Sequence, residues 1–353
     1  MCSGGGAFFW IQHFLERPLQ LVLCLLHFIE LPMKHLIKFY VGPTSGPRSW
    51  SSKLGKEISN LKNNLKNIVD FEPIKGRVIA VDEELLTNGD QKYAYYLALG
   101  IQKGPEFLRE IMGECPDLPC SMSLARWLNT QSYIMRKYVQ TEKPTKALKR
   151  LVAITLNWYL PLFFEIKKDC HVKYGALHFF QAIKYAQESF TEPEKKKAWK
   201  YFRINAYNAH PESVLLSGIC HPFRSTRMKC AEIIIKARRR ARRSDEVRPF
   251  KVPELNFEAE SFLEMVDLSK ADVTPPPLLK NYSDNELELA ALDGSIELPE
   301  IYCHSIHNER AVKDTTTASK REIGQKKSHE HILNLISNRE NIPLRHTKSD
   351  FKS

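Results

Sequence analysis

The chain has 353 residues and a formal net charge of +11, with 43% hydrophobic and 26% charged residues. This mixture is typical of a globular protein, and it excludes a wholly disordered chain, a fibrous protein and a small disulfide scaffold. The length allows about two domains. The positive charge favours anionic partners such as nucleic acid or a membrane surface.

The first fifty residues are strongly apolar and predict two helices, one over 7–15 and one over 18–30. Pro18 suits the first turn of the second helix, and Pro32 is expected to end it. Both helices are apolar on nearly every side, so we expect them to lie inside a larger core.

A more polar stretch follows these helices. Residues 42–50 are rich in glycine, proline and serine and predict a loop. Residues 51–89 predict a linker that contains a short strand-like run over 77–81. We therefore place domain boundaries near residues 50 and 89.

Residues 90–245 predict a helical domain. The helices expected there span residues 90–100, 123–139, 146–168, 172–189, 193–206, 211–219 and 225–243. Gly100 suits a helix C-cap and Ser123 a helix N-cap. Pro161 cannot donate a backbone hydrogen bond, so we expect a kink in the longest of these helices.

The last hundred residues are less regular. Residues 250–257 alternate like a short strand, and residues 258–268 predict a return to helix. Residues 282–300 are acidic, and 341–353 predict a disordered tail. The fold class predicted from the whole pattern is mainly α, with 246–340 as a separate C-terminal segment.

The cysteines and the apolar stretches bear on the cellular compartment. Eight cysteines are scattered through a chain that is long enough to bury a core without crosslinks, which favours a reducing, intracellular location. The most apolar stretch, Leu19 to Met33, has 15 residues, whereas a membrane span needs about 20. We therefore expect no membrane partner.

The densest positive charge lies in residues 224–243, which hold nine basic residues and one acid, Glu232. At about 100° per residue, four of the cations fall within a third of the helix circumference: Lys236, Arg239, Arg240 and Arg243. Cys230, Ile233, Ile234 and Ala237 fall on another face. The stripe suits phosphate groups, because guanidinium offers a planar fork of donors. A solvated charged face and a nuclear-import signal are the alternatives.

Catalytic and metal-binding motifs are weak. Cysteine precedes histidine at residues 170–171, 220–221 and 303–304, but adjacent side chains diverge on a helix and suit one zinc ion poorly. Buried thiols and capping histidines are the expected reading. The chain has no phosphate-binding glycine loop, no Gly-x-Ser-x-Gly elbow and no His-Glu-x-x-His helix. We predict no enzymatic activity, no cofactor and no bound metal.

Several segments, taken in order, carry a resemblance to a known family. They are Arg17-Pro-Leu-Gln-Leu-Val-Leu-Cys-Leu-Leu-His27, Glu30-Leu-Pro-Met-Lys-His35, Gly42-Pro-Thr-Ser-Gly-Pro-Arg-Ser-Trp50, Ala209-His-Pro-Glu-Ser213, Phe250-Lys-Val-Pro-Glu-Leu-Asn-Phe257 and Cys303-His-Ser-Ile-His-Asn-Glu-Arg310. Together they resemble an uncharacterised protein family of arthropod and cnidarian genomes and of bracoviruses. The pattern is also similar, more remotely, to hAT-type transposases, which are mobile-element enzymes with an RNase H-like core.

The transposase resemblance assigns roles to individual residues. Cys24 and His27 resemble the Cys-x-x-His motif of those enzymes, and Arg126 with Trp127 resembles an Arg-Trp pair whose tryptophan can stack on an unpaired base. Glu309 resembles the glutamate of the catalytic triad. The alternatives are buried packing for Cys24 and His27, a core anchor for Trp127 and a surface glutamate for Glu309.

The two catalytic aspartates of that pattern have no match in this chain. Two-metal catalysis needs all three carboxylates. The resemblance therefore implies a degenerate, catalytically inactive relative, truncated at its N-terminus, with a partial RNase H-like remnant formed by the two ends of the chain.

Two functional hypotheses remain. The first is residual binding of DNA or RNA through the basic helix, with a nuclear location if that helix is an import signal. The second is a protein-interaction or host-modulating role without nucleic acid, in which the acidic segment 282–300 or the apolar first helices contact a protein partner or another copy of the chain.

Overall fold

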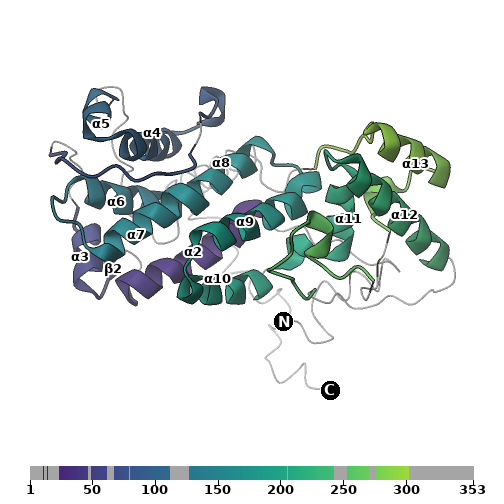
Figure 1. Ribbon diagram of the computed structural model, residues 1–353, viewed down its shortest axis with the longest axis horizontal. Coiled ribbons are helices and arrows are strands. Elements are labelled where there is room, and N and C mark those ends of the chain that lie inside the picture. Colours follow the sequence, from purple (N-terminus) through teal and green to yellow (C-terminus); the bar gives the residue numbers. More distant parts are fainter. Residues whose placement is uncertain are drawn as a thin grey trace, which may run out of the picture. The chain divides into compact units, whose positions relative to one another are not determined.

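The structure is a computed structural model, which describes residues 24–46, 49–61, 67–78, 80–111, 127–204, 206–241, 253–269, 273 and 275–301, together with residues 11 and 14. These residues belong to one compact unit, Met1–His304. A second unit, Ser305–Ser353, lies outside the described residues. The described part is mainly helical, as the sequence predicts (Figure 1).

The described α-helices are α2 (Leu25–Val41), α3 (Lys53–Ser59), α4 (Gly89–Lys103), α5 (Pro105–Ile111), α6 (Trp127–Val139), α7 (Lys146–Ile154), α8 (Leu160–Lys168), α9 (Gly175–Ser189), α10 (Glu192–Ile204), α11 (Pro211–Ile219), α12 (Arg224–Ala241) and α13 (Asp284–Asp293). Most of those from α6 to α12 follow one another closely, whereas long segments separate α3 from α4 and α12 from α13. Single turns of 3₁₀-helix are η1 (Glu83–Leu85), η3 (Val172–Tyr174), η4 (Ala206–Ala209), η5 (Phe262–Glu264) and η6 (Pro277–Leu279). Strands β1 (Thr44–Gly46) and β2 (Ser49–Trp50) form an antiparallel pair, the only sheet among the described residues.

The core is centred on the long rod of α7 and α8, against which α2 and α9 pack (Figure 1). Trp158 is fully buried there, and its indole N–H donates to the carbonyl of Ala182 in α9 at 2.9 Å. Its ring also meets Phe190 and Phe202 edge-on or tilted. The long apolar helices predicted for the start and middle of the chain thus share one core.

The rod contains a turn of π-helix, η2 (Thr155–Tyr159), in place of a simple kink at Pro161. The N–H of Leu160 bonds to the carbonyl of Thr155, five residues earlier. Pro161 has no N–H, so the carbonyl of Asn157 loses its usual helical donor. The proline prediction located the disturbance, and the structure shows that it spreads over the preceding turn.

The carbonyl that the π turn leaves open at Leu156 is satisfied by another segment. The extended residues 67–78 cross this turn, and the N–H of Arg77 donates to Leu156 at 3.0 Å. The side-chain amide of Asn157 returns a bond to the carbonyl of Lys75 at 2.9 Å. Between them lies Gly76, where an added Cβ would come within 2.8 Å of the Leu156 Cβ. The backbones can approach this closely only because residue 76 has no side chain.

Residues 51–89 therefore differ from the linker that the sequence predicts. Ile58, Phe71, Val78 and Leu86 are buried in the same core as the helices. The described residues of the run over 77–81 belong to no strand. The boundaries expected at 50, 89 and 245 fall within the single unit Met1–His304. This stretch therefore combines exposed polar residues with side chains that pack into the core.

The N-terminal helix also differs from expectation, because α2 continues through Pro32 to Val41. The proline removes one helical hydrogen bond, at a cost of about 3 kcal/mol. Met33, Leu36 and Ile37 beyond it are fully buried, and each buried side chain of this size contributes roughly 2 kcal/mol. Burial therefore outweighs the proline. The helix predicted over 7–15 lies outside the described residues, apart from isolated positions.

The segment after α12 does not form the elements predicted for it. Residues 258–268 contain one 3₁₀ turn, η5, instead of a helix. Of the strand predicted over 250–257, the described part makes an isolated bridge, Leu255 to Val266. An RNase H-like remnant built from the two ends of the chain, and the tail 341–353, involve residues outside the described part and stay predictions.

Candidate functional site

The basic helix of the sequence is α12, and its buried face packs on α11 and α13. Cys230, Ile234 and Ala237 are buried, as the helical periodicity of the sequence predicts, and Ile235 is buried as well. A Cβ on Gly218 of α11 would lie 2.4 Å from the Cys230 sulfur, so the two helices approach closely. This packing fixes which cations of α12 face outward.

Two arginines of α12 bind α13 or the residues just before it, and these guanidinium groups are not available to a ligand. Arg227 donates to the carbonyls of Ala291 at 2.7 Å and Leu292 at 3.2 Å, in the last turn of α13. A cation there also meets the negative end of the helix dipole. Arg238 donates to the carbonyls of Leu279 and Tyr282 and pairs with Asp284, at 2.6, 2.8 and 3.1 Å respectively.

The sequence analysis did not separate these two arginines from the rest. Residues 227 and 238 are eleven apart, which brings them to nearly the same angle on a helix. That angle lies beside the buried Ala231 and Ile234. The helical periodicity of the sequence thus indicated that Arg227 and Arg238 face a neighbouring element.

The remaining described cations of α12 point away from the core. Arg239 and Arg240 are exposed, and neither forms an ion pair within the described part of the chain. Lys236 is exposed and pairs with Glu232 one turn earlier. Arg243, the fourth residue of the predicted stripe, lies outside the described residues.

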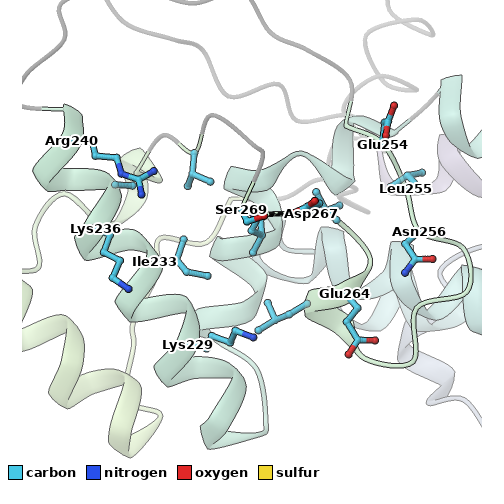
Figure 2. Close-up of a pocket in the computed structure, with 15 residues that line it drawn as sticks. Lys229, Ile233, Lys236, Arg240, Glu254, Leu255, Asn256, Glu264, Asp267 and Ser269 are labelled. Atoms are coloured by element: carbon cyan, nitrogen blue, oxygen red, sulfur yellow. Dashed lines mark hydrogen bonds between the residues drawn. The ribbon is translucent and has the colours of Figure 1, made fainter.

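A groove of about 710 Å³ runs along α12, between this helix and residues 254–269 (Figure 2). Lys229, Lys236 and Arg240 line one wall, and Figure 2 shows carboxylates on the facing wall. These are Glu254, Glu264 and Asp267. The apolar lining consists of Ile233, Ala237, Leu255, Leu263, Val266, Leu268 and Val273. The groove therefore balances three cations against three acids around an apolar floor.

The carboxylates of the facing wall also shape the loop that carries them. Glu264 accepts hydrogen bonds from Ser261 and from the N–H of Glu260, and these bonds hold the pKa of its carboxyl below the ordinary value. Asp267 accepts from the N–H of Ser269 at 3.0 Å and from its hydroxyl at 2.6 Å. Both acids thus stabilise turns of the irregular segment.

Aromatic contacts fix this wall in place. The ring of Phe257 stacks on Trp199 of α10 with centroids 4.4 Å apart and planes 4° from parallel. The guanidinium of Arg203 lies 5.0 Å from the centroid of the same ring. The N–H of Asn256 donates to the carbonyl of Met265 at 2.9 Å. The groove is therefore lined by a packed segment on one side and a packed helix on the other.

The residues that the transposase resemblance singles out are spread over other elements. Cys24 precedes α2 and His27 lies in its first turn; both are exposed, which contradicts the buried-packing alternative for them. Trp127 begins α6, is half-buried against the core, and has the Lys34 Nζ 5.9 Å from its ring centroid. Arg126 and Glu309 lie outside the described residues.

Other reactive groups have structural explanations. Burial raises the pKa of Cys230 to about 12 and that of Cys220 to about 11, so these thiols are protonated and poor metal ligands. Burial also acts to raise the pKa of Glu194, but hydrogen bonds from Arg150, Tyr40 and a backbone N–H bring it below the ordinary value. Within the described ranges no group of three or more His, Cys, Asp or Glu side chains could hold a metal ion.

Comparisons with known protein families, with curated proteins and with solved structures find no match. None of the helices in the described ranges is both long and apolar enough to cross a membrane.

Proposed function

We propose that the protein is a mobile-element-derived protein that binds nucleic acid through the phosphate backbone, without catalysis. Lys236, Arg239 and Arg240 of α12 make the contacts, with Arg243 as the fourth cation of the stripe that the sequence predicts. The order of motifs shared with hAT-type transposases supports the origin. The match of Glu309 alone, out of three required carboxylates, supports the absence of catalysis.

The proposal rests on the difference between the bonded and the exposed arginines of α12. Arg227 and Arg238 donate to α13 and to residues outside it, whereas Arg239 and Arg240 are exposed and form no ion pair among the described residues. Exposed guanidinium groups on adjacent residues of a rigid helix can each contact a phosphate.

The charge of the groove limits where a polyanion can lie. Glu254, Glu264 and Asp267 would repel phosphates inside it. The contacts of the proposal therefore lie on the outer rim, where Arg239 and the ends of Lys236 and Arg240 meet solvent. Electrostatic contacts of this kind read no base sequence.

The groove supports the second hypothesis, a protein-binding role. Its apolar floor and walls of opposite charge suit an amphipathic peptide better than a polyanion. The acidic segment 282–300 is a weaker candidate, because Asp284 pairs with Arg238 and Glu286 accepts hydrogen bonds at the start of α13. Further along α13, the carbonyls of Ala291 and Leu292 accept hydrogen bonds from Arg227, whereas Leu289 is exposed.

The test compares two variants with the same loss of charge. One is Lys236→Ala/Arg239→Ala/Arg240→Ala. The control is Lys75→Ala/Lys143→Ala/Lys146→Ala, which removes three exposed lysines from other segments. Binding of a fluorescein-labelled DNA duplex of random sequence is followed by anisotropy between 50 and 200 mM salt.

If the three α12 cations each contact one phosphate, the α12 variant loses about 2.7 from the slope of log affinity against log salt. The wild type then loses about 40-fold more affinity than the variant over this salt range. The control should keep the wild-type slope. Equal slopes for the two variants, or no binding by the wild type at 50 mM salt, would contradict the proposal and leave the peptide-binding role.

A further inference from the structure

A second basic surface lies on α2 and α10, which pack side by side (Figure 1). Their meeting line is marked by His35 and Tyr201, whose rings stack with centroids 3.4 Å apart and planes 9° from parallel. Both residues are half-buried. The stacked rings come from two helices that are far apart in sequence, so no periodicity in the sequence predicts their contact.

Lysines surround this pair of rings. Burial is the first cause that lowers the pKa of His35 to about 4, and the four strongest charge effects that lower it further all come from lysines. Lys34 and Lys38 belong to α2, whereas Lys197 and Lys200 belong to α10. The face therefore has a strongly positive potential, which does not depend on the cations of α12.

The acids closest in sequence do not cancel this charge. Glu194 of α10 is fully buried and bonded to Arg150, and Glu192 pairs with Lys195. Glu30 lies one turn before Lys34 on α2, at the edge of the surface. The face therefore keeps most of its four positive charges for a ligand.

Aromatic rings lie among these lysines. Phe39 is one turn beyond His35 on α2, and 46% of it is exposed. The Nζ of Lys200 lies 5.9 Å from the centroid of Tyr201, and the Nζ of Lys34 lies at the same distance from Trp127. Exposed rings next to ammonium groups can stack nucleobases while the lysines contact the phosphates, a combination typical of single-strand binding.

We infer that the face formed by Lys34, Lys38, Lys197 and Lys200, with the rings of His35, Phe39 and Tyr201, is a binding surface for single-stranded nucleic acid. The inference rests on the proposed function and adds to it a second contact area and a class of substrate. Duplex DNA would meet the lysines but could not offer unstacked bases to the rings.

The first test separates the two surfaces by mutation. A fluorescein-labelled 20-mer of thymidine is titrated with the wild type, with Lys34→Ala/Lys38→Ala/Lys197→Ala/Lys200→Ala, and with the α12 triple variant. Four lost phosphate contacts lower the salt slope for a single strand by about 2.8, so between 50 and 200 mM salt the wild type loses about 50-fold more affinity than the lysine variant.

The outcomes distinguish the two proposals. A normal slope for the lysine variant together with a reduced slope for the α12 variant refutes this inference and leaves the proposed function standing. The reverse result supports this inference and shows that the α12 cations do not contact the single strand, so the duplex titration remains the test of α12. If both variants keep the wild-type slope for oligothymidine, this inference is wrong.

The second test asks whether a ring contacts bases. Phe39→Ala should weaken oligothymidine binding about fivefold or more and leave duplex binding unchanged, and Phe39→Tyr should restore it. Phe223→Ala removes an exposed phenylalanine from another segment and should have no effect. Equal effects of Phe39→Ala on single strand and duplex would refute base stacking.

A third measurement follows ligand binding in the wild type and therefore does not depend on folding of the lysine variant. The pKa of His35 is measured by NMR, with assignment from a His35→Asn spectrum. Bound phosphates offset the field of the lysines, so saturating oligothymidine should raise this pKa above its free value. An unchanged pKa in the presence of bound oligonucleotide would place the ligand elsewhere.

Discussion

The neighbouring arginines 238 and 239 have opposite roles, which leads to a sharp prediction. Arg238 is 15% exposed and makes three polar contacts, with Leu279, Tyr282 and Asp284. Arg239 is exposed and makes no ion pair within the described part. Truncation of Arg238 should destabilise the fold, whereas truncation of Arg239 should weaken only nucleic-acid binding.

The magnitude follows from the contacts. Hydrogen bonds that involve a charged group contribute about 1.5–3 kcal/mol each, but partly exposed acceptors regain some of this from water. We therefore expect Arg238→Ala to lower the free energy of unfolding by about 2–4 kcal/mol. Arg239→Ala should change it by less than about 0.5 kcal/mol. Arg238→Lys keeps the charge but loses the planar fork and should fall between them.

The assay is equilibrium unfolding in urea, combined with hydrogen exchange of α13. The amides of α13 should exchange faster in Arg238→Ala than in the wild type, because this helix loses one of its two arginine partners on α12. In DNA titrations the order reverses: Arg239→Ala weakens binding, and folded Arg238→Ala binds normally. Equal stability of the two variants would refute the account of Arg238 as a structural residue.

Two further predictions concern stability. Gly76→Ala should destabilise the protein by about 1–3 kcal/mol in the same urea assay, because the new Cβ would lie 2.8 Å from that of Leu156; an unchanged midpoint would mean that residues 67–78 can move away freely. Burial lowers the pKa of His210 from 6.5 to about 4, so its proton binds more tightly in the unfolded chain. Stability should be complete above about pH 6.5 and fall as the pH drops towards 4, and His210→Asn, which can still cap α11, should lose that part of the pH dependence.

Proline positions and apolar runs predicted a helix correctly where the tertiary packing buries the same residues. The predicted bounds of α11 match those observed, because Pro211 suits the first turn and the run that follows is apolar throughout. Pro32 misled the prediction because a local rule carries no information about how deeply the next turn is buried. The helix predicted over 258–268 was wrong for a related reason, because contacts between Phe257 and α10 hold this segment in an irregular conformation.

The candidate site was predicted only in part. The amphipathic pattern of α12 located its exposed cations, and the same pattern contained the angle shared by Arg227 and Arg238. The groove could not be predicted, because it forms where residues 254–269 lie beside α12. No periodicity in the sequence indicates that contact. The surface on α2 and α10 is of the same kind, because its four lysines come from two helices more than 150 residues apart.

The π turn in the central rod has a geometric consequence for every element packed on α8. One turn of i→i+5 bonding holds one residue more than an α-helical path, and each residue of an α-helix rotates the next by about 100°. Thr155–Tyr159 therefore set the rotational phase between α7 and α8. Deletion of one of these residues should restore regular bonding and rotate α8, whose Phe163 and Ile166 are buried, relative to α7.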